Sequence, residues 1–567
     1  MAASNSSVNQ EQLEKLLAKV DPAIQTYIGE LQTQITRLAD IGYALSAEQN
    51  LPKLLNTIIE EGMRITNSDG GTLYLRTEDD RLKFEIMKTR SLGTDMGGVS
   101  ETPIPESIYP VRLYGEDGKP NNHNVSAYVG LTGKTLNIPD AYSCEDFDFT
   151  GTKGFDKAHG YRSKSFLTIA MKNHENDIIG VLQLLNAQDP ESGDIIPFST
   201  EKKKLIESLA SQAAVAITNV RLIQDLEKLL ESFIQLIADA IDEKSPYTGG
   251  HCSRVPVISM MLAEKVHATD WGPLAPVQFT QEDMHELRIA AWLHDVGKIT
   301  TPEYVVDKAT KLETIYDRIK EVEVRFEVLR RDVEIEFLKK KLTLDAQDVD
   351  GLAALESWKN AELEQLDDDL KFIQIANIGG EFMAPEKQER VKQIGARPIT
   401  INGEATTLLN DEMVYNLNIP KGTLTDEERE IINNHIVVTI DMLEKLPFPK
   451  KLRRVPEFAG GHHEKMDGTG YPRRLTGDQM SIQARIMAIA DVFEALTATD
   501  RPYKKGKTLS EALRIMGFMK KDHHLDPELF DVFLKEGVFL EYAQEYMGKE
   551  YIDEVDIQPL LEIQPQK

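Results

Sequence analysis

The chain contains His-His-Glu-Lys-Met-Asp-Gly-Thr-Gly-Tyr-Pro at residues 462–472. Adjacent histidines are rarely needed for packing, whereas histidine is the commonest metal ligand among the side chains. The glycines and the proline of this stretch favour sharp backbone turns. We therefore interpret it as a loop that presents two imidazoles to a metal centre. A surface loop with two ordinary histidines is the alternative.

Other parts of the chain supply further candidate ligands. Residues 286–295 are predicted to form a buried helix that carries His294 and Asp295. Neighbouring side chains on a helix point about 100° apart, so both can contact one metal while the second oxygen of Asp295 reaches another. Asp491 lies in an apolar run, where a buried carboxylate without a partner is costly. The candidate ligands together are His251, His294, Asp295, His435, His462, His463 and Asp491.

This set of donors suits a pair of divalent metal ions. Neutral imidazole and carboxylate bind borderline metals such as iron, manganese, nickel and zinc. Two such ions roughly 3.5–4 Å apart can clamp an in-line phosphoryl displacement. One carboxylate must bridge the pair, and Asp295 is our candidate because it directly follows His294. The residues thus predict a binuclear site for phosphoryl chemistry.

Four motifs in this order resemble those of the HD-GYP family of bacterial phosphodiesterases. They are His294-Asp295-x-Gly297-Lys298, residues 462–472, Ala490-Asp491-Val492-Phe493 before Leu496-Thr497, and Arg501-Pro502-Tyr503-Lys504. The resemblance covers about residues 246–312 and 422–540. Members of the family cleave cyclic di-GMP, and some cleave the related cyclic GMP-AMP. The resemblance therefore implies a bacterial phosphodiesterase that hydrolyses cyclic di-GMP to pGpG, with further cleavage to GMP left open.

The family pattern also implies a role for each matched residue. One metal would be held by His251, His294, Asp295 and Asp491, and the second by His435, His462, His463 and the shared Asp295. The catalytic residues would be Asp295 and Lys298, because Lys298 resembles the family lysine that contacts the scissile phosphate and protonates the leaving oxygen. The cofactors would be two divalent ions, with iron preferred over manganese, nickel or zinc. Substrate binding would involve Lys298, Gly470, Tyr471, Pro472, Arg501 and Lys504.

Three positions depart from the family pattern. Members with three metals carry a glutamate where this chain has Tyr247, so we expect two metals. Ser245 stands where many members have aspartate, which puts the support of His251 in doubt. The run from Asp491 to Arg501 looks one residue longer than in many relatives. This weakens the assignment of Arg501 and Lys504 as the residues that bind phosphate.

Simpler interpretations remain open for several residues. Lys298 could be a cation at a helix C-terminus, His435 an ordinary helix residue, and Arg501 with Lys504 a solvated face. The function also has alternatives. They are a cyclic GMP-AMP phosphodiesterase, another HD phosphohydrolase that acts on nucleotides or ppGpp, and a non-catalytic signalling scaffold.

Composition limits the class of protein. The 567 residues suffice for several domains, and 65 basic against 93 acidic residues give a net charge of −28. This charge argues against nucleic acid polymers and anionic membranes as partners, because basic surfaces bind phosphate backbones. The two cysteines make no disulfide framework, the N-terminus has no signal-peptide pattern, and no stretch approaches the ~20 apolar residues of a membrane helix. A cytoplasmic protein is the simplest interpretation.

Residues 37–220 are predicted to form a separate domain. A helical pattern over residues 40–63 comes first, and a closing helix starts near Thr200. This order, with Ile179–Asn186 and Gln212–Asn219, resembles a GAF domain. GAF domains bind cyclic nucleotides, haem, bilins or other small molecules, and many only dimerise, so the ligand stays unknown. Strands are predicted at residues 71–75, 82–86, 165–171 and 178–186.

An apolar heptad seam follows the GAF-like domain. Its spacing is typical of a parallel dimeric coiled coil, and no glycine or proline separates it from the preceding helix. We therefore expect a homodimer through the GAF and linker helices. The alternative is one amphipathic helix that packs on its own domain. The seam consists of Leu222, Leu226, Leu229, Phe233, Leu236 and Ala240.

An insertion interrupts the catalytic region at residues 313–421. Charged, helix-prone runs at residues 315–342 and 352–374 predict a solvated helical hairpin, and a loop-rich portion follows Gly379. A lid, a dimer contact and a partner site are all compatible with it. The core resumes at Gly422, and Thr425 and Glu428 just after it have capping-box spacing.

The predicted fold class is α+β. It combines a GAF-like antiparallel sheet with flanking helices, a coiled-coil linker, and an all-α HD-type metallohydrolase domain with a large, mostly helical insertion. The predicted parts are an N-terminal helical segment (1–36), a GAF sensor domain (37–220), a linker helix (221–245), a catalytic domain (246–540) and a C-terminal tail (541–567).

Overall fold

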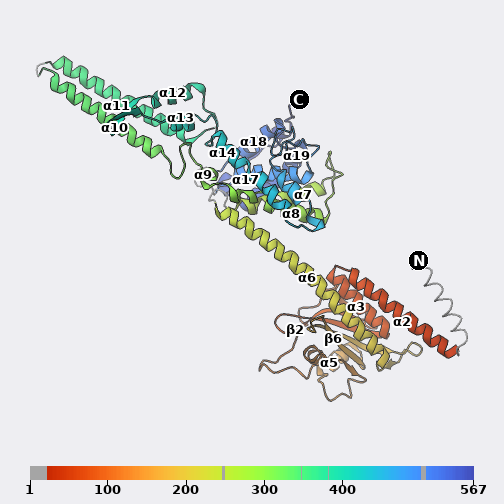
Figure 1. Ribbon diagram of the computed structural model, residues 1–567. Helices are drawn as coiled ribbons and strands as arrows, with labels where there is room; N and C mark the ends of the chain where they lie inside the picture. Colours follow the sequence, from red (N-terminus) through yellow and green to blue (C-terminus); the bar gives the residue numbers. More distant parts are fainter. Residues whose placement is uncertain (1–21, 245–249, 346–347, 381, 500–505, 567) are drawn as a thin grey trace, which may run out of the picture. The chain divides into compact units, whose positions relative to one another are not determined.

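The computed structural model describes residues 22–244, 250–345, 348–380, 382–499 and 506–566 (Figure 1). The chain divides into two compact units, Met1–Leu229 and Leu230–Lys567. The first unit contains an antiparallel sheet with helices, and the described part of the second consists of helices and one two-stranded hairpin. The predicted α+β fold class is therefore confirmed. Within the described residues, no helix is both long enough and apolar enough to cross a membrane.

An eight-stranded antiparallel sheet forms the centre of the first unit. Its main strand order is β3-β2-β1-β7-β6-β5, with β4 paired to β2 and β8 paired to β7. The four strands predicted from the sequence all form, as β1, β2, β6 and β7. The strands are β1 (Ser68–Arg76), β2 (Arg81–Thr89), β3 (Thr94–Gly97), β4 (Val111–Arg112), β5 (Leu136–Ile138), β6 (Phe166–Lys172), β7 (Ile178–Gln188) and β8 (Ile195–Ile196).

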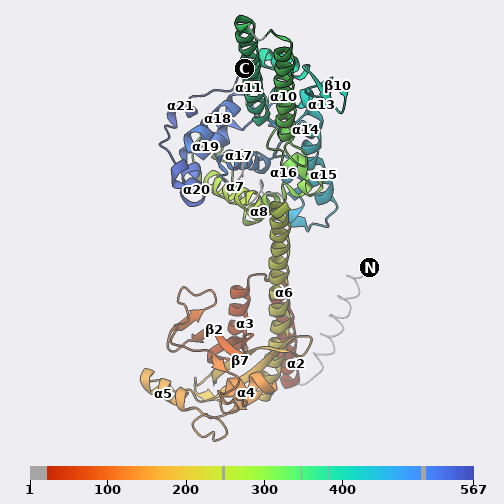
Figure 2. The ribbon, with the colours of Figure 1, turned by 90° about the vertical axis from the view of Figure 1, so that its left-hand side faces the viewer.

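Alternation along the strands gives this sheet two apolar faces. On β1, Leu73 and Leu75 pack in the core formed with helices α3 (Leu51–Thr66) and α6 (Thr200–Lys244). Tyr74, between them, packs in a separate core with α4 (Val125–Thr132). Figure 2 shows α3 and α4 on opposite sides of the strands, with α5 (Thr150–His159) near α4. Successive side chains of a strand point to opposite faces, so each buried strand serves both cores.

The structure breaks the helical pattern predicted over residues 40–63. Helix α2 (Pro22–Ala47) ends before α3 begins. The side chain of Asn50 accepts a hydrogen bond from the N–H of Lys53 (3.0 Å), and Pro52 lies in the first turn of α3. An asparagine cap and an early proline start a helix rather than continue one. Residues 1–21 of the predicted N-terminal segment lie outside the described residues.

A helical core builds the second unit. Helices α7 (His251–Ala268), α8 (Gln281–Leu293) and α17 (Ile482–Thr497) pack together in its centre. The remaining elements outside the insertion are η1 (Val296–Thr300), α9 (Glu303–Val306), α14 (Asp426–Asn433), α15 (His435–Glu444), η2 (Lys450–Leu452), α16 (Val455–Gly460), α18 (Leu509–Lys521), α19 (Pro527–Lys535), α20 (Val538–Tyr546), η3 (Lys549–Tyr551) and α21 (Gln558–Leu561).

Two helix boundaries differ from the prediction. Helix α8 ends before His294, so His294 and Asp295 follow the helix instead of lying on it, and the tight 3₁₀ turn η1 begins with a bond from the N–H of Lys298 to the carbonyl of Asp295 (2.9 Å). The predicted capping box at Thr425 does start α14, but that helix ends before Asn434, and α15 starts at His435. Asparagine is a weak helix former, which explains the second break.

The insertion is a module with its own apolar core. Helices α10 (Ile319–Thr343) and α11 (Val349–Ile378) run side by side as the predicted hairpin (Figure 1). The sequence predicted a loop-rich portion after these helices, and this prediction is wrong. The portion contains α12 (Pro385–Gly395), the strands β9 (Pro398–Ile401) and β10 (Glu404–Thr407), and α13 (Asp411–Leu417). Such short elements depend on tertiary packing rather than on their own periodicity.

The C-terminal segment also packs on the helical core of the second unit. The predicted boundary at residue 540 falls inside α20, and Tyr542 and Leu560 are buried in the same core as α7 and α17. A separate tail over residues 541–567 is therefore a wrong prediction for the described residues.

Candidate metal centre

The helical core brings the seven candidate ligands together. Asp491 lies inside α17, and the other six lie at helix ends. His251 and His435 are the first residues of α7 and α15. The last four lie within three residues after the ends of α8 and α16: His294, Asp295, His462 and His463. Helix ends project side chains into one space while the helix bodies pack around it.

Hydrogen bonds fix the orientation of four imidazoles. In His294, His435 and His462, Nδ1 donates to the backbone carbonyl three residues earlier. In His251, Nδ1 donates to the carboxylate of Glu494. With Nδ1 as the donor, Nε2 is the nitrogen available to a metal, which is the usual arrangement of metal-bound histidine.

The ligand atoms form two groups. Within each group, one nitrogen or oxygen atom per residue lies within 4.8 Å of the others. The first group is His251, His294 and Asp491, and the second is His435, His462 and His463.

Asp295 lies between the two groups. Its Oδ2 is 3.3 Å from Nε2 of His251 and 3.3 Å from Nε2 of His294. Its Oδ1 is 3.2 Å from Nε2 of His435. Asp295 also forms a third close group with His294 and His462. One carboxylate therefore faces both halves of the centre, as a bridging ligand must.

Two buried atoms at this centre have no hydrogen-bond partner among the described residues: Oδ1 of Asp295 and Nε2 of His462. Nε2 of His435 lies 3.2 Å from Oδ1 of Asp295, and Nδ1 of the same ring donates to the carbonyl of Ile432. Leaving a buried carboxylate oxygen unpaired is costly. A cation between these atoms removes that cost, and the donor set suits a divalent metal. The residues present therefore fit divalent metal ions.

Electrostatics also favour positive charge here. Burial lowers the pKa of His251, but the carboxylates of Glu494, Asp295 and Asp491 outweigh it and hold that pKa well above its ordinary value. Burial lowers the pKa of His462 to about 3, with help from the neighbouring imidazole of His294. The group that contains His251 thus attracts a cation. The group that contains His462 offers a neutral imidazole, which is the protonation state that binds metal.

Lys298 lies beside the carboxylate of Asp295. Its ammonium is paired with Oδ2 of Asp295, and this carboxylate raises the pKa of Lys298 although burial acts in the opposite direction. The glycine of the motif has a packing role. A Cβ on Gly297 would lie 2.0 Å from the carbonyl oxygen of His435, and its N–H donates to Oγ1 of Thr439 (2.9 Å). Only glycine lets η1 approach α15 this closely.

The loop after the paired histidines folds back on them. The ring of Tyr471 stacks on His463 with centroids 4.8 Å apart. A Cβ on Gly470 would lie 2.5 Å from Cα of Glu464, so a side chain does not fit there. The buried carboxylate of Glu464 accepts hydrogen bonds from the N–H groups of Arg473 (2.7 Å) and Leu475 (3.0 Å), just after Pro472. These contacts hold the loop beside the ligands.

Sequence reasoning missed Glu464 and Glu494 as supports of the site. Glu494 is fully buried, and besides His251 it accepts a hydrogen bond from Nε of Arg254 (2.7 Å). Burial raises the pKa of Glu494, but His251 and Arg254 outweigh it and lower the pKa to about 2. The sequence did offer one indication of this role. Glu494 is a charged residue in an apolar helix, three residues after the candidate ligand Asp491. Ser245, Tyr247 and the whole motif from Arg501 to Lys504, which were discussed from the sequence, lie outside the described part.

Family models match both units of the chain. Residues 50–217 match a model described as GAF domain. Residues 248–375 and 411–529 match two models that are each described as HD domain. The first HD match contains His251, His294 and Asp295, and the second contains the other four candidate ligands.

Known proteins are similar to parts of the chain. A 3′3′-cGAMP-specific phosphodiesterase 3 of Vibrio cholerae serotype O1 is 41% identical over 116 residues, which are 20% of this chain and 24% of that protein. A cyclic di-GMP phosphodiesterase of Pseudomonas aeruginosa is 41% identical over 119 residues, 21% and 27% of the two chains. A cyclic di-GMP phosphodiesterase of Thermotoga maritima is 39% identical over 114 residues, 20% and 30% of the two chains. The chain thus spans less than a third of the length of these relatives.

Among solved structures, the GAF domain from an Acinetobacter phosphoenolpyruvate-protein phosphotransferase aligns with 34% of this chain and 98% of its own, at 17% identity and a TM-score of 0.25. The family matches and the site motifs agree on the organisation of the chain. The chain matches a GAF domain followed by HD domains, and its site motifs resemble those of the HD-GYP family.

Proposed function

We propose that this chain is a metal-dependent phosphodiesterase that hydrolyses cyclic di-GMP to pGpG under the control of its GAF domain. The observation that carries the proposal is the position of Asp295 between two groups of three candidate ligands, with its buried Oδ1 left without a hydrogen-bond partner among the described residues. The names of the Pseudomonas and Thermotoga relatives support cyclic di-GMP as the substrate. A second cleavage would give GMP.

The residues divide the work as follows. Two divalent ions would supply an ionised water and neutralise charge on the phosphate. Lys298, held beside Asp295, offsets charge that develops on the phosphate and protonates the leaving 3′ oxygen. Tyr471, stacked on His463, lines the substrate side of the histidines. Arg501 and Lys504 complete the proposed phosphate contacts. We propose iron as the metal, with manganese, nickel and zinc as alternatives.

Cyclic GMP-AMP is the second candidate substrate. The Vibrio relative that is named for this activity is 41% identical to the chain over the matched segment. Both substrates contain the same two phosphodiester linkages, so the metal centre treats them alike. Contacts to the bases must separate the two activities.

Metal analysis together with hydrolysis assays tests the proposal. We expect about two metal ions per chain after anaerobic purification, and turnover of cyclic di-GMP followed by chromatography. Asp295→Asn should lower turnover at least about 100-fold, since loss of mere supporting residues already costs 10–100-fold. Asp332→Asn, which changes an exposed carboxyl group of the insertion, is the matched control. Turnover of cyclic GMP-AMP alone would identify it as the substrate in place of cyclic di-GMP. Absence of metal and of turnover after reconstitution with iron or manganese would overturn the proposal that the chain is a metal-dependent enzyme.

We also propose that the protein acts as a cytoplasmic homodimer. The heptad seam on α6 is exposed: Leu226 and Leu236 each keep 63% of their surface. The α6 residues that pack on the second unit are others, namely Ile234, Ala238 and Ile241. The seam is therefore free for a second copy, and this counts against a helix packed only on its own domain.

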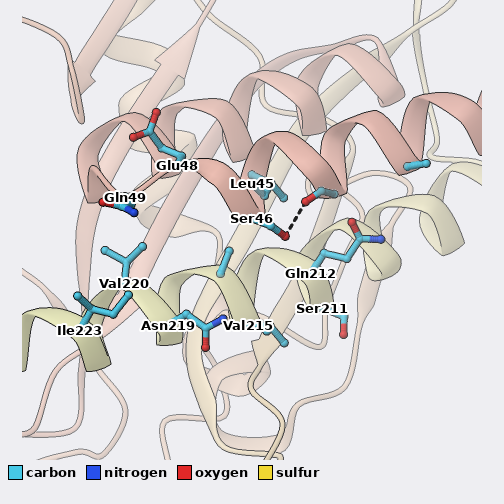
Figure 3. Close-up of a pocket in the computed structure, with 13 residues that line it drawn as sticks. Leu45, Ser46, Glu48, Gln49, Ser211, Gln212, Val215, Asn219, Val220 and Ile223 are labelled. Carbon is cyan, nitrogen blue, oxygen red and sulfur yellow. Dashed lines mark hydrogen bonds between the residues drawn. The ribbon is translucent and has the colours of Figure 1, made fainter. Parts of the chain in front are cut away.

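A pocket between α2 and α6 continues this seam. It has a volume of about 660 Å³, and Val215 and Asn219, which line it, extend the four–three spacing backwards from Leu222. Figure 3 shows Ser46 of α2 facing Gln212 of α6 across it. We propose the α2 and α6 helices of a second copy as the occupant. Sedimentation of the full chain should give a dimer that Leu226→Glu dissociates. A monomeric wild type would end this part of the proposal.

A further inference from the structure

The last residue of α6 contacts the turn that carries Lys298. Nζ of Lys244 donates to the backbone carbonyls of Lys298 (3.2 Å), Ile299 (2.6 Å) and Thr301 (2.8 Å). These carbonyls lie at the C-terminal end of η1 and just after it. That of Lys298 also accepts from the N–H of Thr301 at 3.1 Å, whereas the last carbonyls of a helical turn have no N–H partner within the turn. A lysine at this end satisfies them and complements the negative end of the turn.

Asp242, two residues earlier, contacts α7 in the complementary way. Both of its carboxylate oxygens accept from the N–H of Cys252, at 3.1 and 3.3 Å. Cys252 is the second residue of α7, next to His251. The cap position of α7 is Gly250, which has no side chain to accept these N–H groups. A buried carboxylate from α6 therefore serves as the N-terminal cap of the helix that begins with a candidate ligand.

The preceding turns of α6 hold this end in place. Ile234, Ala238 and Ile241 are buried in the core that includes α7 and α8. Glu231 forms an ion pair with Arg288 of α8 at 2.7 Å. Because α6 is one helix from Thr200 to Lys244, its terminal turn is the direct extension of the last helix of the GAF domain.

We propose that Asp242 and Lys244 form a latch through which α6 positions the metal centre. Asp242 positions the His251 end of α7, and Lys244 positions η1 with Lys298. Both are positioning residues and touch no reacting atom. A shift of α6 by one residue moves the helix by about 1.5 Å and turns it by about 100°, which removes Lys244 from its three carbonyls. The latch rests on the proposed function and adds a route of regulation to it.

Hydrogen–deuterium exchange of the full chain tests the latch without any turnover. Lys244→Met should speed exchange of the backbone amides in residues 296–301, and Lys244→Arg should restore much of the protection. Lys204→Met, at an exposed position of the same helix, is the control and should leave this segment unchanged. Asp242→Asn should speed exchange at residues 251–254 instead. Unchanged exchange at residues 296–301 in Lys244→Met would overturn the latch.

Kinetics of the same variants test its role in catalysis. In Lys244→Met we expect kcat to fall roughly 10-fold, as for other supporting residues of metal sites, while KM and metal content stay near the wild-type values. A wild-type kcat in spite of faster exchange would refute the positioning role. If the wild type hydrolyses neither cyclic dinucleotide, the proposed function fails, and the exchange result alone still decides whether α6 holds η1.

Discussion

The candidate metal centre contains a partly buried lysine and the base of the insertion contains two buried ones, but the two regions compensate the charge differently. In the metal centre, Lys298 lies against the carboxylate of Asp295, which raises the lysine pKa in spite of burial. At the base of the insertion, Lys311 donates to the carbonyls of Leu417 (2.9 Å) and Ile419 (2.7 Å), and burial lowers its pKa to about 8. A carboxylate keeps a buried ammonium charged, whereas carbonyl dipoles only offset part of the loss of water.

A second lysine at the base of the insertion follows the pattern of the metal centre. Nζ of Lys308 lies 2.7 Å from Oε2 of Glu428 and 3.0 Å from Oδ1 of Asn416. Glu428 belongs to α14, directly before the helix that begins with His435. The base therefore contains one lysine with a carboxylate and one without, three residues apart. This pair allows the comparison to be tested inside a single module.

The largest effect is expected where a carboxylate would lose its lysine. Lys308→Met leaves Glu428 largely buried without its cation, which costs about 3–5 kcal/mol of unfolding free energy. Urea unfolding followed by tryptophan fluorescence measures this loss. Lys339→Met, at an exposed position of α10, is the control. In the double variant Lys308→Met/Glu428→Gln the loss should be smaller than the sum of the single losses. Strict additivity would show that the two side chains do not act as a pair.

An intermediate effect is expected for the carboxylate that supports His251. Glu494→Gln keeps the shape of the side chain but removes its charge, so the imidazole of His251 becomes a weaker ligand. We expect metal affinity to fall 10–100-fold, which corresponds to about 1.4–2.7 kcal/mol. Competition with a chelator measures the change, and Glu494→Asp should recover part of it. Unaltered affinity in Glu494→Gln would argue against His251 as a ligand.

The smallest effect is expected from Lys311, and only in a defined pH range. Its pKa is about 8 in the folded chain against 10.5 for the free side chain. Between these values the unfolded chain binds more protons, so the folded chain gains stability as pH rises. Below about pH 8 both states are protonated and the contribution is constant. The stability of the wild type relative to Lys311→Met should therefore rise from about pH 8 to about pH 10. A difference that is flat in pH would mean that Lys311 keeps its ordinary pKa.

The motifs allowed the ligand residues to be predicted, but not the contacts that hold them. Metal chemistry restricts the residue types, so His294, His462 and Asp491 stand out locally. Their supports come from distant parts of the chain. Glu494 lies 243 residues from the histidine it fixes, and no local pattern relates the two. Such pairs become visible only when the fold brings α7 and α17 together.

The same contrast applies to the secondary structure. Helices α10 and α11 are long enough for their charge pattern to be read directly from the sequence. The hairpin β9–β10 and the helix α13 are too short for this, and they owe their form to packing of residues such as Ile399, Leu408 and Met413 in the core of the insertion. The break between α2 and α3 depended on the side chain of Asn50, which a periodicity argument ignores.

The two ends of the insertion meet in space. Oγ1 of Thr423 donates to the carbonyl of Lys308 at 2.9 Å. A chain segment whose ends touch can lengthen, shorten or be exchanged without forcing its host to change shape, because the closure cost grows only slowly with length. Residues 309–422 thus have the geometry of an exchangeable cassette. A short turn could replace them in a smaller engineered version of the second unit, and a binding module of another origin could be grafted at the same point.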